Sequence, residues 1–229
     1  MRYAVYFSPS EHDALSQAAA AWLGRDAFSG KTVTRPDVDG IERGALDALL
    51  SDPRRYGFHA TLKAPFELAE GTSESDLMAA FAAFCAGHAP FDIPRVIVSQ
   101  LGPFFAIVPD QVYPQLQDFA ASVVRDFEPF RAPLSEADIA RRKPERLSDS
   151  QRENLMRWGY HHVMDDFRFH MTLTGPAQPE IAPLLQSVLS DRFAAFVDRP
   201  LTVSGLGLFV EPERGAPFTV KSWLPLSGA

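Results

Sequence analysis

The sequence predicts a mixed α+β fold built from two related halves, and three observations support this prediction. The order strand, helix, strand, helix, strand occurs twice along the 229 residues. Residues 58–65 and 169–176 align without gaps and share Phe, His, Thr, Leu and Pro. Hydrophobic residues make up 46% of the chain, which is enough to form a sizeable core at this length. We therefore expect one bilobed domain over residues 1–229, with a pseudo-two-fold relation between its halves.

The first half covers approximately residues 1–103. It opens with an aromatic and β-branched run and an alanine-rich helix that ends near Leu23. Residues 24–57 contain many glycines and prolines, so they are expected to be mostly connection. A run resembling a capping box, from Ser73 to Asp76, predicts the start of a helix. The strands are expected at 3–7, 58–66 and 92–101.

The second half covers approximately residues 104–229 and repeats this order. Strands are expected at 104–108, 168–174, 201–210 and 218–224, and helices at 112–127 and 179–193. Residues 131–157 interrupt the repeat as a basic insertion, with seven basic against five acidic residues in a chain of net charge −7. Two interpretations stay open: a solvated helical segment, or a positively charged lid in which Arg141, Arg142 or Lys143 meets a substrate.

Charge and composition exclude several classes of partner. The net charge of −7 disfavours extended nucleic acid, because a polyphosphate is repelled by an acidic chain without a basic stripe. The N-terminus becomes polar at Ser8, which predicts no signal peptide and no membrane partner. Cys85 lies among apolar residues at helical spacing and is expected to be a buried, inert thiol. These features predict a cytoplasmic protein with a small phosphorylated substrate, and they leave the oligomeric state open.

Two His-x-Thr strands are the main functional candidates. Successive side chains of a strand point to opposite faces, so the polar residues of each strand are predicted to share one face. On the first strand they are Gly57, His59, Thr61 and Lys63. On the second they are Arg168, His170, Thr172 and Thr174. Such a face suits a polar cleft better than a core.

Transfer at a phosphodiester is the chemistry that this set of groups favours. His59 and His170 could act as acid and base on opposite sides of phosphorus, while Thr61 and Thr172 donate to phosphate oxygens. Lys63, Arg168 and Thr174 add further substrate-binding groups on the same faces. No metal and no cofactor is required. A single His-x-Thr would suggest only an ordinary strand histidine, but here the motif occurs in both halves.

The paired Phe-His-Ala-Thr-Leu and Phe-His-Met-Thr-Leu strands resemble the two-histidine (2H) phosphoesterase superfamily. The surrounding residues look like its branch associated with bacterial phosphonate-degradation operons. The resemblance implies antiparallel sheets flanking a central cleft, helices outside, and metal-independent hydrolysis of a cyclic phosphodiester such as a ribose cyclic phosphate. It also implies catalytic roles for His59 and His170. The basic insertion is not part of the superfamily's minimal core.

Other functions are considered beside this hypothesis. A pair of histidines, His161 and His162, precedes Asp165 and Asp166, but their spacing fixes no third metal ligand, so a metal site is rejected. The sequence holds no phosphate loop of the G-x-x-x-x-G-K-S/T type and no G-x-S-x-G elbow. The remaining alternatives are a non-catalytic module that binds a nucleotide or an RNA end, and an RNA-end phosphodiesterase or ligase.

Overall fold

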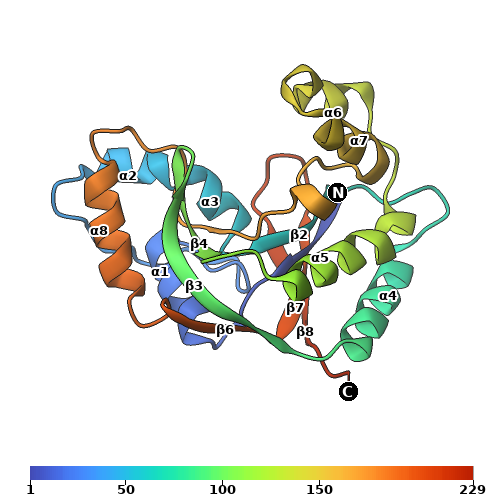
Figure 1. The fold of residues 1–229 in the computed structure, drawn as a ribbon, viewed down its shortest axis with the longest axis horizontal. Coiled ribbons are helices and arrows are strands. Elements are labelled where there is room, and N and C mark those ends of the chain that lie inside the picture. The colour runs from blue at the N-terminus through green and yellow to red at the C-terminus, as the bar shows by residue number, and fades with distance from the viewer. Residues whose placement is uncertain (229) are drawn as a thin grey trace.

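Two four-stranded antiparallel sheets form the centre of the protein in the computed structural model, which describes residues 1–228 (Figure 1). The first sheet has the strand order β2 (Ala60–Phe66), β1 (Arg2–Phe7), β7 (Gly205–Glu211), β8 (Thr219–Pro225). The second has the order β5 (Met171–Thr172), β4 (Phe104–Pro109), β3 (Phe91–Leu101), β6 (Arg199–Val203). The predicted mixture of helices and antiparallel sheets is confirmed.

The two halves of the chain exchange a strand. β3 belongs to the first half in sequence, yet it pairs with β4 of the second half, from Val96 opposite Pro109 to Leu101 opposite Phe104. Reciprocally, β7 of the second half pairs with β1. The expected boundary near residue 103 therefore falls inside a β-hairpin, and neither sheet is made from one half alone. Because each half needs the other's strand to complete its sheet, the halves are expected to fold together.

The helices begin where the sequence supplies caps. Asp13 accepts a hydrogen bond from the backbone of Leu15 at the start of α1, and Ser73 with Asp76 forms the expected capping box of α4. The α-helices are α1 (Ala14–Leu23), α2 (Arg43–Leu49), α3 (Ser51–Tyr56), α4 (Glu74–Gly87), α5 (Pro114–Asp126), α6 (Glu136–Arg141), α7 (Asp149–Trp158) and α8 (Ala182–Phe193). Short 3₁₀ turns lie at Glu128–Phe130, Pro144–Arg146 and Met164–Asp166.

The first sheet contributes to two hydrophobic clusters, one on each face. Along β1, Val5 and Phe7 join the large core, whereas Ala4 and Tyr6 join a smaller cluster with Phe209. This division follows from the two-residue period of a strand. The smaller cluster lies beside His59, since the Tyr6 ring stacks on that imidazole. Aromatic side chains on this face of the first sheet therefore pack against His59.

Three expected elements differ in the structure. Residues 51–56 form α3, where connection was predicted. The single strand expected at 201–210 is divided at Ser204 into β6 and β7, which belong to different sheets. The second histidine strand is limited to Met171–Thr172, so His170 lies just before it. Local patterns predict extended backbone, but the partner strand decides where a ladder begins and ends.

The basic insertion forms α6 and α7, which project from the rest of the fold at the upper right of Figure 1. The first residue of the insertion, Arg131, is held to the preceding 3₁₀ turn, because the Arg131 guanidinium binds Glu128. Elsewhere, the thiol of Cys85 is buried, and burial raises its pKa to about 11, as expected for an inert cysteine. Within residues 1–228, every helix is too short or too polar to cross a bilayer.

Candidate functional site

The histidines of both motifs line one cavity, which we call the histidine cavity. It measures about 260 Å³ and lies between the α3 end of the first half and the β5 region of the second. Its lining residues are Asp52, Pro53, Tyr56, Gly57, His59, Phe104, His170, Thr172, Thr174, Gly175 and Pro176. Four of the seven predicted site residues therefore border one space: the two histidines, Thr172 and Thr174.

Both imidazoles are held in the same way. The Nδ1 atom of His59 lies 2.9 Å from the carbonyl oxygen of Gly57, and Nδ1 of His170 lies 2.7 Å from that of Arg168. A carbonyl can only accept, so in each ring Nδ1 carries the proton and donates it. The Nε2 atom of each neutral ring is then the one with a free lone pair. The two halves thus present equivalent nitrogen atoms.

Aromatic rings and one hydroxyl surround His59. The Tyr6 ring stacks on it with centroids 3.9 Å apart, and the Tyr56 ring lies 5.9 Å away. Nε2 of His59 is 3.2 Å from Oγ1 of Thr61, which can donate to it while the ring is neutral. On the other side of the cavity, the Phe104 ring lies 5.7 Å from that of His170. These contacts restrict the orientation of both rings.

Burial keeps both histidines neutral at pH 7. Desolvation lowers the pKa of His59 from 6.5 to about 4, against the opposing effect of its hydrogen bond to Gly57, and the charge of His170 lowers it further. Desolvation also lowers the pKa of His170, against the hydrogen bond to Arg168. A bound anion would favour the protonated forms. The cavity is therefore suited to a ligand that brings its own negative charge.

Lys63 lies away from the histidine cavity, contrary to the expected sharing of a face. The register between β1 and β2 shifts between the Tyr6–Thr61 and Val5–Lys63 pairs, and such a bulge interrupts the alternation of side chains. Lys63 is 2% exposed, and its ammonium group forms an ion pair with Glu128 and donates to the carbonyl of Val124 at 3.1 Å. In this position it holds β2 to α5.

The other predicted binding residues occupy three different environments. Thr174 is fully buried, where its hydroxyl accepts from the backbone N–H of Phe105 and donates to the carbonyl of Gly175. Arg168 is exposed, and its guanidinium donates to the carbonyl of Phe167 at 2.7 Å. Thr61 reaches the cavity through its contact with His59. Thr172 is half-buried in the cavity lining. Roles in substrate binding stay predictions for all four.

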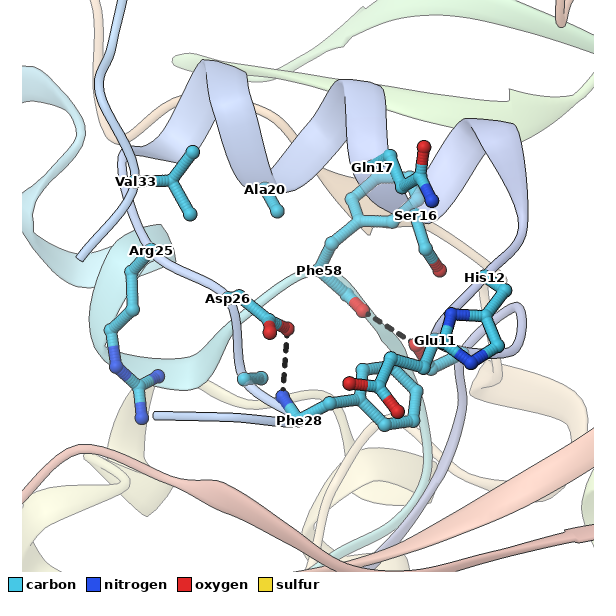
Figure 2. A pocket seen from close by; sticks show the side chains of 12 residues that line it. Glu11, His12, Ser16, Gln17, Ala20, Arg25, Asp26, Phe28, Val33 and Phe58 are labelled. Carbon is cyan, nitrogen blue, oxygen red and sulfur yellow. Dashed lines mark hydrogen bonds between the residues drawn. The ribbon is translucent and has the colours of Figure 1, made fainter. Parts of the chain in front are cut away.

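A separate cavity of about 290 Å³ lies behind Phe58, between α1 and the loop that follows it (Figure 2). Figure 2 shows the hydrogen bond from the backbone N–H of Phe28 to Asp26 at its edge. The Ser8 hydroxyl also donates to the carbonyl of Phe58. These polar groups already bind backbone. Phe58 directly precedes His59, but neither His59 nor His170 lines this cavity.

His161 and His162 of the second half lie beside Asp166. Nδ1 of His161 is buried without a hydrogen-bond partner in residues 1–228, and burial lowers its pKa to about 4. The neighbouring Asp166 carboxylate is bound by Ser150 and Asn154 instead. Within the described residues, no group of three or more His, Cys, Asp or Glu side chains is arranged to hold a metal ion.

Two tyrosines near His59 were not identified from the sequence. Tyr56 precedes the first motif by three residues and ends α3, a helix that the sequence did not predict. Tyr6 lies on β1, where both faces are apolar, so alternation alone does not distinguish a core residue from a site residue. A register between β1 and β2 would have revealed Tyr6, because it pairs directly with Thr61.

With this geometry, the histidine cavity can bind an anionic group between two imidazoles. Each neutral Nε2 can take up a proton and then donate a charge-assisted hydrogen bond to a phosphate oxygen. The Thr172 hydroxyl in the lining adds a neutral donor. A phosphate ester of a small molecule is the ligand class that this set of groups favours.

Comparison with known proteins assigns the family. The chain belongs to the family described as "Protein of unknown function (DUF1045)", whose model matches residues 61–219. A solved structure, TT0787 of Thermus thermophilus, aligns over 100% of this chain and 99% of its own, with 16% identity and a TM-score of 0.45. That similarity is too low to assign a shared fold.

Two curated relatives are named ribose 1,5-bisphosphate phosphokinase PhnN. The protein of Janthinobacterium sp. (strain Marseille) is 38% identical over 99% of this chain and 51% of its own length. The protein of Laribacter hongkongensis (strain HLHK9) is 34% identical over 100% of this chain and 53% of its own. The chain therefore spans about half the length of the curated relatives it matches.

These names correct the predicted function. A phosphokinase is a transferase, and both relatives carry that name, so the predictions of a hydrolase and of a cyclic phosphodiesterase are wrong. The alternatives, binding of a nucleotide or an RNA end and RNA-end cleavage or ligation, do not match the names either. The error arose because paired His-x-Thr motifs indicate phosphate chemistry without specifying which phosphate group is transferred, or to what.

Proposed function

We propose that this chain binds a phosphorylated ribose in the histidine cavity and serves the phosphoryl-transfer reaction for which its relatives are named. The observation that carries this proposal is the matched pair of imidazoles. Each is fixed through Nδ1 beside a shared cavity, and Nε2 of His59 also contacts the Thr61 hydroxyl at 3.2 Å. In the proposed complex, His59 and His170 take up protons and bind one phosphate group of the sugar, and Thr172 donates to it.

The proposal assigns the sugar-phosphate side of the reaction to this chain. The relatives' names specify ribose 1,5-bisphosphate as the compound that is phosphorylated. A cavity of about 260 Å³ is near the lower limit for small-molecule sites, which agrees with a sugar phosphate better than with a larger ligand. Because the chain matches about half of each relative, the remaining half is expected to supply other parts of the full activity.

Two finer assignments belong to the same proposal. The equivalent strand orders of the two sheets support a duplicated fold of the two-histidine superfamily type, without that superfamily's hydrolytic reaction. The relatives' names also support a role in the phosphonate metabolism that the sequence resemblance implied. The buried, unreactive Cys85 agrees with a cytoplasmic setting.

Calorimetric titration of the purified chain tests the proposal. Ribose 1,5-bisphosphate and ribose 5-phosphate are expected to bind, and unphosphorylated ribose is not. The variant His170→Gln should weaken binding by about tenfold or more, because a charge-assisted hydrogen bond contributes roughly 1.5–3 kcal/mol. His12→Gln is the matched control, since His12 is exposed and lies outside the histidine cavity.

The proposal is rejected if neither sugar phosphate binds, or if His59→Gln, His170→Gln and wild type bind them equally. Phosphoryl transfer from ATP is measured on the same samples with labelled nucleotide. Transfer by the wild-type chain that is lost in His170→Gln would assign the acceptor site directly.

A further inference from the structure

A second pocket, which we call the arginine pocket, adjoins the histidine cavity. It measures about 240 Å³ and lies between the basic insertion and the edge of the first sheet. Five of its lining residues are arginines that come from distant parts of the chain, Arg2, Arg131, Arg141, Arg142 and Arg214. Only two acids, Glu67 and Asp138, line it. The lining therefore has more basic than acidic side chains in a protein whose net charge is −7, although Arg2 and Arg131 are paired with the carboxylates of Glu211 and Glu128 outside it.

Arg142 is the arginine whose charge is not balanced. Arg141 and Arg214 share the carboxylate of Asp138, and Arg2 is paired with Glu211 at 2.5 Å. Arg142 forms no ion pair within residues 1–228, although it is half-buried. Its guanidinium lies instead over the Tyr160 ring, 4.9 Å from the centroid. Its hydrogen-bond donors are thus available to an anion that enters the pocket.

The Asp138 carboxylate in this pocket is already stabilised by its neighbours. Its hydrogen bond from Ser135, together with Arg141 and Arg214, lowers the pKa of Asp138 to about 2. This ionised carboxylate is shared by Arg141 and Arg214, and Arg214 also pairs with Glu67 at 3.2 Å. A dianion in the pocket could bind the donors of Arg142 without displacing an ion pair of the other arginines.

Tyr56 connects the two pockets. It lines both the arginine pocket and the histidine cavity, and its ring centroid lies 5.9 Å from that of His59. A small ligand that fills the histidine cavity can therefore extend past this ring toward Arg142. A ligand with negative charge at both ends would match the two basic sites, and an apolar or uncharged end would not.

We propose that the arginine pocket binds the second phosphate group of a ribose bisphosphate, with Arg142 as its main contact and Tyr56 against the sugar between the two phosphates. This inference rests on the proposed function, which places the first phosphate in the histidine cavity. It assigns to the basic insertion the role of distinguishing a bisphosphate from a monophosphate. Arg141 is expected to be a weaker phosphate contact than Arg142, because Arg141 is already paired with Asp138.

Binding of two ligands to Arg142→Gln tests this inference. Ribose 1,5-bisphosphate should bind this variant about tenfold or more weakly than wild type, while ribose 5-phosphate changes less than about threefold. Arg142→Lys keeps the charge and should recover part of the loss. Arg152→Gln is the control, because it removes the same charge from an exposed position of the same insertion. Thermal melting of each variant checks that it folds.

Inorganic phosphate separates failure of this inference from failure of the proposed function. Wild type should bind two phosphate ions, whereas Arg142→Gln and His170→Gln should each lose a different one. If Arg142→Gln binds the bisphosphate as tightly as wild type does and binds as many phosphate ions, the role assigned to the arginine pocket is wrong. If Arg142→Gln loses a phosphate ion but no ribose phosphate binds wild type, the proposed function fails, and with it the bisphosphate assignment.

Discussion

The imidazole of His59 lies against the phenol ring of Tyr6, with ring centroids 3.9 Å apart and an interplanar angle of 24°. The stack connects the small aromatic cluster of the first sheet to the histidine cavity. It also contributes to the burial that lowers the pKa of His59. One aromatic residue of the interior thus covers a face of a candidate site residue.

Replacing this ring should change the titration of His59. In Tyr6→Leu, water reaches the imidazole, so the pKa of His59 is expected to rise from about 4 toward its ordinary value of 6.5. Tyr6→Phe keeps the ring and should leave the titration close to that of wild type. NMR titration of the histidine ring protons measures both variants. An unchanged titration in Tyr6→Leu would contradict the role assigned to the stack.

Stability should depend on pH through the same histidine. In the unfolded chain His59 titrates near 6.5, whereas in the folded protein its pKa is about 4. Between these values the unfolded state binds more protons, so the free energy of unfolding should decrease as the pH falls from 6.5 toward 4. Urea unfolding at several pH values checks this. His59→Gln should reduce the slope, and His12→Gln should not.

Ligand binding should be accompanied by proton uptake. At pH 7 both site histidines are neutral, because desolvation lowers the pKa of each. A bound phosphate group raises these pKa values, so affinity is expected to increase as the pH decreases from 8 to 6. Calorimetry in buffers of different ionisation enthalpy counts the protons. Uptake should be smaller in His170→Gln, and the absence of any uptake in wild type would contradict the proposed contacts.

Gly57 should be sensitive to substitution, because its backbone both turns and holds His59. Its φ is +78°, and a Cβ there would approach the Cβ of Ala27 to 2.5 Å. Gly71 has a φ of +81° with open space around it, so Gly71→Ala is the matched control for backbone strain. Gly57→Ala should lower the melting temperature more than Gly71→Ala and weaken phosphate binding. Equal effects of the two variants would show that strain alone matters.

The ion pair of Lys63 should support stability and leave phosphate binding intact. Glu128→Gln removes the carboxylate shared by the buried Lys63 ammonium group and Arg131, and a loss of about 2–4 kcal/mol is expected from urea unfolding. Asp37→Asn breaks an exposed pair with Arg43 and should cost less than about 1 kcal/mol. Lys63→Met should bind ribose phosphates like wild type if it folds. A loss of binding without a loss of stability would restore the predicted substrate role.

Much of the local structure could be predicted from short-range patterns. The β1 strand, the α1 helix and the capping box of α4 follow from residues close together in sequence, where alternation and caps act directly. The repeated motif likewise identified His59 and His170, which line one cavity. Long-range pairing was less predictable. At Ser204 the chain leaves one sheet and enters the other, and no pattern of neighbouring residues indicates this change.

By itself, the sequence determined most of the strands and helices, though not α3 or the division at Ser204, and it identified the two histidines, because hydrophobic period and side-chain chemistry are properties of neighbouring residues. Only the tertiary structure decided which groups share the site. A bulge in the β1–β2 register carries Lys63 into an ion pair with Glu128 instead of the cavity. Packing places Tyr6 on His59, and the folded insertion brings Arg142 to the pocket that also contains Tyr56. These contacts join residues far apart in the chain, so no pattern of neighbouring residues predicts them.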